Sequence, residues 1–339
     1  MIELYLLVGS LAVLVTLLLC GFVGCSPFSG DDSSGSDYST TIKTTKDLVA
    51  YWRLGELPSA IPGDGTGTAR DDVGGFHGYH HAYPNPITTP DNQQHSPASS
   101  GQIILGAIPG LLEHFPSSPC LDVEGGWVLI PFDNHLNPPV FTLEAWVSPD
   151  PFIDKGFFHC LVQSTGPGGS GQQKTGWGLY LGPDDPNKTP PGDHFWQVWM
   201  GDGTQFKRMA IANGTDCPTK LQLTYLALTF DGTNLQLWLY YPDTGQNIDI
   251  PHLRGALNSS VTTFKRNDTS PDGHGPVIIG AGNPLFPGGG PFSLPIYPFR
   301  GKIQEVALYK RDLTNIPCLE GELCKIQTLA AHEKAGGNL

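Results

Sequence analysis

Charged side chains are scarce in this chain, and basic ones are the scarcer kind. Only 15% of its 339 residues are Asp, Glu, Lys or Arg, and 19 Lys and Arg stand against 32 Asp and Glu, for a formal net charge of −13. Binding to a phosphate backbone needs clustered Lys and Arg. The composition therefore argues against a nucleic-acid partner and leaves cations and neutral ligands such as glycans as candidates.

Two short motifs of metal, redox and hydrolase chemistry are also missing from the sequence. There is no Cys-x-x-Cys pair, which argues against a zinc ribbon or a thioredoxin-type site. There is no Gly-x-Ser-x-Gly either, the turn that presents the nucleophile in many serine hydrolases. These absences leave a binding or structural role as the first hypothesis.

Glycine and proline are abundant, with 43 and 31 residues. Helix interiors reject both, so a mostly helical fold is excluded. Between these residues lie short alternating or apolar runs, rich in β-branched and aromatic side chains, and such runs predict β-strands. They cover residues 48–54, 127–132, 141–147, 176–182, 195–200, 223–230, 235–241, 276–282 and 301–310.

The pattern within these runs predicts an all-β, antiparallel β-sandwich. Over 141–147, apolar residues alternate with Thr142, Glu144 and Trp146, the period of two expected for a sheet with unlike faces. Asp231-Gly232 lies between two strong runs and predicts a hairpin, because both residues tolerate positive φ. One short C-terminal helix is predicted over 319–335, where apolar residues fall at helical spacing and Gly336-Gly337 end it.

The first 25 residues form a separate segment. Residues 2–23 are almost continuously apolar, and as a helix they are long enough to cross a bilayer core. Phe22-Val23-Gly24-Cys25 resembles a bacterial lipobox, which predicts lipidation at Cys25. A lipoprotein signal, a retained membrane anchor and an ordinary cleaved signal remain open. All three place the rest of the chain in the cell envelope or outside the cell.

Residues 26–45 are rich in Ser, Thr, Gly and Asp and offer almost nothing to bury. Such a composition predicts a flexible, disordered linker. A linker between a membrane attachment and a folded domain lifts that domain off the bilayer. A disordered end without a role is the alternative.

Seven cysteines occur, two of them within the first 25 residues. Cys318 and Cys324 are close enough in sequence to close a small disulfide loop. Pairing of Cys160 with Cys217 is a weaker suggestion, and Cys120 then remains as a small buried side chain. The count agrees with export to an oxidising compartment.

Several segments of the body follow one another in an order found in one family. They are Val49–Glu56, Ala69–Gly74, Phe76–Gly78, Leu136–Val147, Leu226–Gly232, Phe299–Tyr309 and Ala331-His332. With them the chain resembles the laminin-G-like, concanavalin A-like jelly-roll domains common in bacterial surface and phage proteins. The resemblance implies one jelly-roll β-sandwich domain over residues 46–336, followed by a tail of residues 337–339.

The resemblance also implies a metal site. Some domains of this kind hold calcium near the first Asp-containing loop and the last strand, and carboxylate and backbone oxygens are the ligands that calcium prefers. The corresponding residues here are Asp71, Asp72 and Glu305.

Catalysis is not expected from this chain. A glycoside hydrolase needs two carboxyl groups that flank the scissile bond. Related jelly-roll glucanases carry them in the pattern Glu-x-Asp-x-x-Glu, and the sequence lacks this pattern. No residue is therefore assigned a catalytic role.

Tryptophan side chains are the candidates for contact with a sugar ring. Trp196 and Trp199 lie in one predicted strand, and their odd spacing means that both cannot face the core of a flat strand. An outward-facing indole ring is a stacking surface for the apolar face of a sugar. Both residues are therefore named as candidate ligand-binding residues.

Together these features predict a non-catalytic module of the cell surface that attaches to the membrane through its N-terminus. It would recognise a glycan or a protein through its loops. A structural subunit of a surface assembly is the alternative, and a glycoside hydrolase of the jelly-roll type is a second alternative.

Overall fold

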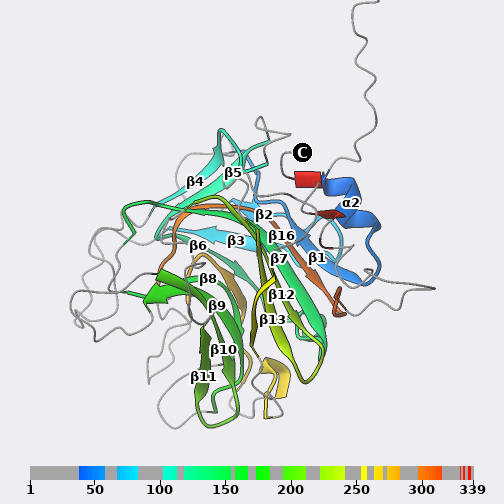
Figure 1. Ribbon diagram of the computed structural model, residues 1–339. Helices are drawn as coiled ribbons and strands as arrows, with labels where there is room; N and C mark the ends of the chain where they lie inside the picture. The colour runs from blue at the N-terminus through cyan, green and yellow to red at the C-terminus, as the bar shows by residue number, and fades with distance from the viewer. Residues whose placement is uncertain are drawn as a thin grey trace, which may run out of the picture. The chain divides into compact units, whose positions relative to one another are not determined.

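The computed structural model describes most of the chain from Tyr38 onward (Figure 1). The described residues are 38–57, 67–82, 102–112, 118–153, 157–166, 173–183, 194–210, 222–240, 253–257, 263–269, 273–282, 297–314, 329, 331–332 and 335–336. No helix within these ranges is long and apolar enough to span a membrane. The predicted signal or anchor with Cys25, and the predicted Cys318–Cys324 disulfide, lie outside them.

Strands dominate the described residues. The first sheet contains β1 (Leu48–Trp52), β4 (Gln102–Ala107), β5 (Cys120–Glu124), β7 (Phe141–Pro149), β12 (Thr224–Phe230), β13 (Leu235–Tyr240), β14 (Leu253–Leu257) and β16 (Arg300–Tyr309). The second sheet contains β2 (Thr68–Ala69), β3 (Gly78–His81), β6 (Trp127–Ile130), β8 (His159–Thr165), β9 (Gly176–Pro183), β10 (His194–Gly201), β11 (Phe206–Ala210) and β15 (Val277–Ile279). The helix α2 (Tyr38–Thr44) precedes them, and two 3₁₀ turns, η1 (Asn134–Leu136) and η3 (Asn267–Thr269), lie in connections.

Strands that are distant in the sequence lie side by side in both sheets. The first sheet has the order β14-β13-β12-β7-β16-β5-β4, with β1 also paired to β16. The second sheet has the order β11-β10-β9-β8-β15-β6-β3-β2. Each of these pairs is antiparallel, for example β7 with β12 and with β16. The predicted antiparallel all-β body is therefore confirmed.

The main core lies between the two sheets. Leu143 and Ala145 of β7 and Leu179 of β9 are buried in one continuous apolar cluster, so the inner faces of both sheets contribute to it. Phe141 of β7 stacks on Trp177 of β9, with ring centroids 5.2 Å apart. The alternation in residues 141–147 thus identified the inward-facing side chains correctly.

The opposite face of the first sheet is buried as well. A second apolar cluster there includes Trp146 of β7, Tyr225 of β12, Tyr38 and Ile42 of α2, and Leu329. Figure 1 shows α2 and the C-terminal helical residues on this side of the fold, near β1. The first sheet is therefore covered on both faces, which the alternation in sequence did not indicate.

The predicted linker of residues 26–45 is wrong over its C-terminal part. Tyr38, Ser39 and Ile42 are buried in α2, so the folded body includes residues from Tyr38 onward. Tyr38 and Ile42 are four residues apart and so share one face of a helix. Two apolar side chains at this spacing are enough to dock a short helix, although the surrounding composition is typical of a linker.

The remaining predictions agree with the structure where it describes them. All nine predicted runs contain a strand. Asp231 caps the β12–β13 hairpin by accepting hydrogen bonds from the backbone N–H groups of Thr233 (2.7 Å) and Asn234 (2.6 Å), and Gly232 has a φ of +99°. In the predicted C-terminal helix, residues 329, 331–332 and 335 are helical, and Gly336, which was expected to end the helix, is helical too.

Cys120 and Cys160 are both buried free thiols. Cys120 is the small buried side chain that was predicted. The suggested pairing of Cys160 with Cys217 is wrong, because the Cys160 thiol is free. Burial raises the pKa of both thiols, the Cys120 thiol to about 11, so neither is a reactive thiolate at neutral pH.

Candidate functional site

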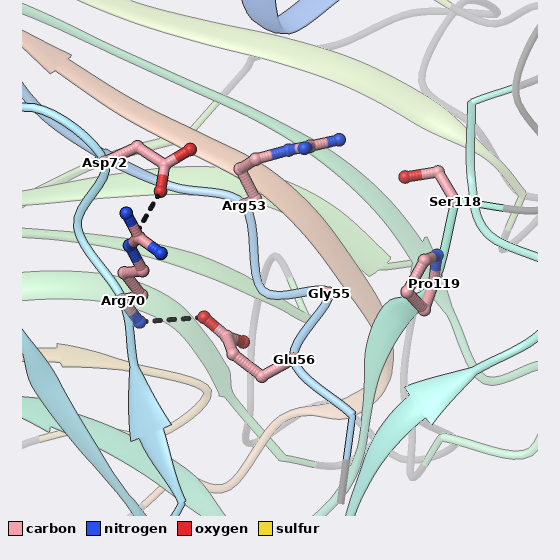
Figure 2. Close-up of a pocket in the computed structure, with 7 residues that line it drawn as sticks. All are labelled: Arg53, Gly55, Glu56, Arg70, Asp72, Ser118 and Pro119. Carbon is pink, nitrogen blue, oxygen red and sulfur yellow. Dashed lines mark hydrogen bonds and ion pairs between the residues drawn. The ribbon is translucent and has the colours of Figure 1, made fainter.

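A pocket of about 310 Å³ opens beside the C-terminal end of β1 (Figure 2). Three loop segments form it, one after β1, one after β2 and one before β5. Its lining residues are Arg53, Gly55, Glu56, Arg70, Asp72, Ser118 and Pro119. Four of these side chains are ionisable, so the pocket concentrates charge in a chain that is poor in it.

Asp71 fixes the loop that carries two of these residues. Its carboxylate accepts backbone N–H bonds from Tyr51 of β1 and from Val73, Gly74 and Phe76 of its own loop, at 2.9–3.0 Å. Tyr51 thereby ties the loop to the first sheet. Arg70 and Asp72 flank this buried anchor, so their positions at the pocket follow from it.

A glycine allows the first and third segments to approach closely. A Cβ on Gly55 would lie 2.7 Å from the backbone oxygen of Pro119, closer than carbon and oxygen atoms pack. The absence of a side chain therefore sets the width of the pocket at this point.

Arg70 connects the acidic groups on one side of the pocket. Its backbone N–H donates to Glu56 Oε1 at 2.7 Å, and its Nε lies 3.3 Å from Asp72 Oδ1, as Figure 2 shows. Lys43 of α2 lies 2.8 Å from the other oxygen of Asp72. Glu56 Oε2 lies 3.7 Å from Nε2 of the buried His80. Two basic side chains thus hold Asp72 in place, and the backbone N–H of Arg70 holds Glu56.

Arg53 is tied to a carboxyl group beneath the pocket. Its Nε lies 3.5 Å from Glu305 Oε1, and its backbone oxygen accepts the N–H of Glu305 at 3.1 Å. Glu305 sits at an irregularity in the β7–β16 pairing, between Gln304 and Ala307, and has a φ of +59°. Such a bulge places an extra residue in one strand and redirects its side chain. The strained backbone of Glu305 therefore directs its carboxyl group toward Arg53.

Burial raises the pKa of the Glu305 carboxyl group from 4.5 to about 7, although Arg53, Tyr51 and Gln304 each act to lower it. The Tyr51 hydroxyl donates to Glu305 Oε2, and Gln304 Nε2 donates to Oε1 at 3.3 Å. Removal from water penalises the carboxylate more than these partners compensate. Glu305 therefore changes its protonation near neutral pH.

Gln304 links this buried group to the far wall of the pocket. Its Nε2 also donates to Ser118 Oγ at 3.1 Å, and its Oε1 accepts the N–H of Leu111 at 2.7 Å. The segment before β5 is therefore held by the same strand that carries Glu305.

The structure brings the three predicted calcium ligands to one region, but they have different partners. Asp71 uses both oxygens for backbone N–H groups, Asp72 contacts Lys43 and Arg70, and Glu305 is fully buried beneath Arg53. Within the described residues no group of three or more His, Cys, Asp or Glu side chains is arranged to hold a metal ion. Calcium binding stays a prediction, which a rise in melting temperature on addition of calcium would support and an unchanged one would end.

The two tryptophans of β10 point to opposite faces of the second sheet. Trp196 belongs to the main core and is 1% exposed, so its ring packs against protein. Trp199 is half-buried on the outer face, stacks on Tyr180 with ring centroids 4.7 Å apart, and contacts Phe158 and Tyr297 edge-on. Contact of Trp199 with a ligand stays a prediction.

The sequence predictions missed the pocket as a unit. Arg53 and Glu56 lie in one of the segments that carry the family resemblance, and Arg70 and Asp72 lie in another. In a chain with 15% charged residues, these two local concentrations of charge could have indicated a binding site. The sequence alone did not show that both segments lie next to Ser118 in the folded chain.

No protein-family model and no curated protein matches the chain. Several solved structures show a partial likeness in fold. Domain 4 of AbnA, an extracellular GH43 arabinanase from Geobacillus stearothermophilus solved with arabinotriose, has 14% identity and a TM-score of 0.42, over 84% of this chain and 98% of that domain.

Two further likenesses are to parts of larger proteins. Trypanosoma rangeli sialidase has 14% identity and a TM-score of 0.41, over 86% of this chain and 34% of the sialidase. The binding domain of botulinum neurotoxin DC, in complex with SialylT, has 9% identity and a TM-score of 0.41, over 84% of this chain and 51% of that one. Because each TM-score is below 0.5, these likenesses assign neither a family nor a function to this chain.

Proposed function

We propose that the chain is a non-catalytic binding module of the jelly-roll type, similar to laminin-G-like and concanavalin A-like domains, that recognises a glycan through its loops. The ligand that the pocket fits best is a sugar that carries a carboxylate group. The observation that carries this proposal is the convergence of Arg53 and Arg70 on one pocket of a chain with a net charge of −13.

The two arginines are placed to meet an anion. A guanidinium group binds a carboxylate through paired, charge-assisted hydrogen bonds. The Arg70 side chain is 75% exposed and contacts Asp72 through Nε. Arg53 uses the same atom toward Glu305, and Figure 2 shows its guanidinium group directed across the pocket toward Ser118.

The other lining groups suit the rest of a sugar. Glu56, Asp72 and Ser118 present oxygen atoms that accept hydrogen bonds from hydroxyl groups,. Small-molecule pockets range from about 300 to about 1,000 Å³, and a volume of about 310 Å³ is at the lower end of that range. The pocket is therefore suited to one sugar unit at the end of a glycan.

The proposal places this module in the cell envelope or outside the cell, where it meets surface glycans or glycoproteins. The apolar residues 2–23 and Cys25 support attachment to a membrane,. Mass measurement of the intact mature protein would show whether the segment is removed and whether Cys25 carries lipid.

Hydrolysis of a glycosidic bond is the second candidate function. The raised pKa of Glu305 next to the pocket favours it, because catalytic acids have pKa values near the working pH,. Glu305 is, however, fully buried and is not among the lining residues, whereas a general acid must reach the reacting oxygen. Release of reducing sugar by the wild-type chain, lost in Glu305→Gln, would favour the hydrolase over the binding module.

A glycan array with acidic and neutral glycans, probed with the full chain in detergent, tests the proposed function. We expect binding to glycans that end in a carboxylate sugar. Arg53→Gln and Arg70→Ala should each weaken binding about tenfold, the scale for loss of a charge-assisted contact. The matched control is Arg208→Ala, which changes an exposed arginine of β11 in the second sheet. Equal binding of neutral glycans, or no loss in either pocket variant, would contradict the proposal.

A further inference from the structure

Two strongly exposed apolar side chains lie beside the pocket. Leu57 is 70% exposed and directly follows Glu56, which lines the pocket. Ile108 is 67% exposed and directly follows β4, whose last residue pairs with the first residue of β5, next to the lining Pro119. Of the large apolar side chains in the described part of the chain, only that of Phe152 is more exposed. We call Leu57 and Ile108 the rim residues.

Contacts at the pocket wall fix the segments that carry both rim residues. A Cβ on Gly110 would lie 1.8 Å from the backbone oxygen of Ser118, so the segment of the second rim residue packs directly on a lining residue. Glu56 accepts the backbone N–H of Arg70 at 2.7 Å, which holds the residue before the first rim residue in the pocket (Figure 2). The rim residues therefore border the pocket from two of the three segments that form it.

The inside of the pocket and its border differ in chemistry. Four of the seven lining residues are ionisable, whereas the rim residues are aliphatic and exposed. Apolar surface gains free energy when a ligand removes it from water, and exposed apolar side chains beside a polar site are typical of a surface that a ligand covers. A ligand that matches both parts has a charged or polar end and an apolar end.

The volume of the pocket determines which part of a ligand reaches the border. A space of about 310 Å³ holds one sugar unit,, so the group that is attached to this unit must leave the pocket past its border. A second sugar there would lose water from its hydroxyl groups against Leu57 and Ile108, and these side chains offer no hydrogen bond in return. An apolar group would instead bury both side chains and itself.

We propose that the pocket binds an acidic sugar whose anomeric carbon carries an apolar group, and that Leu57 and Ile108 contact this group. The inference rests on the proposed function and names the class of ligand within it. Arg53 and Arg70 bind the carboxylate, whereas the rim residues set the preference for what is attached to the sugar. The apolar group is aromatic or aliphatic, and the two kinds are separated by the choice of probes.

Titration calorimetry of the full chain in detergent tests the inference with glycosides of glucuronate and of N-acetylneuraminate. Each acid is used as its methyl, phenyl and cyclohexyl glycoside and as a disaccharide with glucose. We expect the phenyl or the cyclohexyl glycoside to bind about tenfold tighter than the methyl glycoside, the scale for burial of one apolar group. The disaccharide should bind no tighter than the methyl glycoside. The tighter of the two apolar probes shows which kind of group is preferred.

Variants of the rim residues assign the gain to them. Leu57→Ser and Ile108→Ser should each reduce the affinity for the apolar glycoside about threefold, half of a tenfold gain on the free-energy scale, and leave that for the methyl glycoside unchanged. The matched control is Phe152→Ser, which changes an 82% exposed side chain beside the Asp150–Arg300 ion pair, near the other end of β5. Detergent micelles take up the same share of an apolar probe in every variant, so differences between variants come from the protein.

Three results would overturn the inference and leave the proposed function intact. They are equal affinity for the methyl and the apolar glycosides, tighter binding of the disaccharide than of the apolar glycosides, and a gain that persists in both rim variants. All three variants replace exposed side chains, and circular dichroism checks that each of them folds. Absence of binding by every probe would overturn both the inference and the proposed function.

Discussion

His332 Nδ1 lies 2.9 Å from Glu144 Oε2, although 188 residues separate the two in sequence. Both side chains are buried, at 1% and 0% exposure. The hydroxyl groups of Tyr225 (2.5 Å) and Tyr309 (2.6 Å) donate to the same carboxylate. His332 Nε2 also contacts Thr45 Oγ1 at 2.8 Å, just after α2. A polar network thus joins the C-terminal residues, α2 and the outer face of the first sheet.

Removal of Glu144 should be among the most destabilising changes in the chain. Glu144→Ala leaves two tyrosine hydroxyls and a histidine buried without their acceptor, which costs about 3–5 kcal/mol when a buried charged network is broken. Urea unfolding followed by circular dichroism measures this loss. The half-buried Glu124 of β5 is the control, and Glu124→Ala should cost less than about 1 kcal/mol. Equal losses in the two variants would mean that the network adds nothing to stability.

Asp71 and Asp72 are neighbours with different roles, and substitution should separate them. Asp71→Ala removes the acceptor of four backbone N–H groups, so we expect a loss of about 3 kcal/mol in unfolding free energy. Asp72→Ala removes ion pairs whose basic partners, Lys43 and Arg70, are 39% and 75% exposed, and exposed pairs contribute about 1 kcal/mol or less. A larger loss in Asp72→Ala would show that Asp71 is not the anchor of this loop.

The sequence predicted the sandwich well because strand-forming residues alternate with a period of two. In β7 this alternation correctly selected Leu143 and Ala145 for the inner face. It did not show that Trp146 and Glu144 on the other face are buried too, because that burial depends on α2 and on residues almost 190 positions away. The composition of residues 26–45 was typical of a linker, and only the tertiary contacts of Tyr38 and Ile42 reveal the helix.

The pocket was harder to predict than the fold. Arg53 and Arg70 line one pocket because Trp52, the last residue of β1, and Asp71, in the loop after β2, form an isolated bridge, and such a bridge leaves no periodic pattern in the sequence. The predicted calcium ligands fell in the right region. The roles of two of them depend on tertiary structure, since Asp71 binds backbone groups and Glu305 is buried at a β-bulge. Local sequence patterns therefore predicted the strands, whereas the pocket depends on tertiary contacts that such patterns do not contain.

Gly55 should matter for binding as well as for folding. In Gly55→Ala the new methyl group would lie 2.7 Å from the Pro119 oxygen, so the two walls of the pocket must move. We expect a stability loss of about 1–3 kcal/mol, as for other overpacked sites, and a reduction in ligand affinity of about tenfold. The control is Gly67→Ala, where the nearest atom, at 2.9 Å, is the end of the Leu105 side chain and moves easily. Unchanged affinity in Gly55→Ala would show that the close contact between Gly55 and Pro119 does not shape the pocket.

The pH dependence of stability should report Glu305 directly, without any ligand. Its pKa is about 7 in the folded chain, against 4.5 as the ordinary value, so between these values the folded state holds a proton that the unfolded state has lost. Its stabilising contribution is therefore fully present below pH 4.5 and is lost as the pH rises through 7. The difference corresponds to about 3 kcal/mol.

Glu305→Gln keeps the shape of the protonated side chain and cannot ionise. We therefore expect the variant to match the wild type at pH 5 and to exceed its unfolding free energy at pH 8 by up to about 3 kcal/mol. Urea unfolding at several pH values measures both curves. Arg53, on the exposed side of the pair, is 39% exposed in its side chain and remains hydrated without its partner. The opposite result would be a variant that is less stable than the wild type at pH 8 and equal to it at pH 5. The carboxylate form of Glu305 would then be the stabilising one, and its pKa in the folded chain would be lowered and not raised.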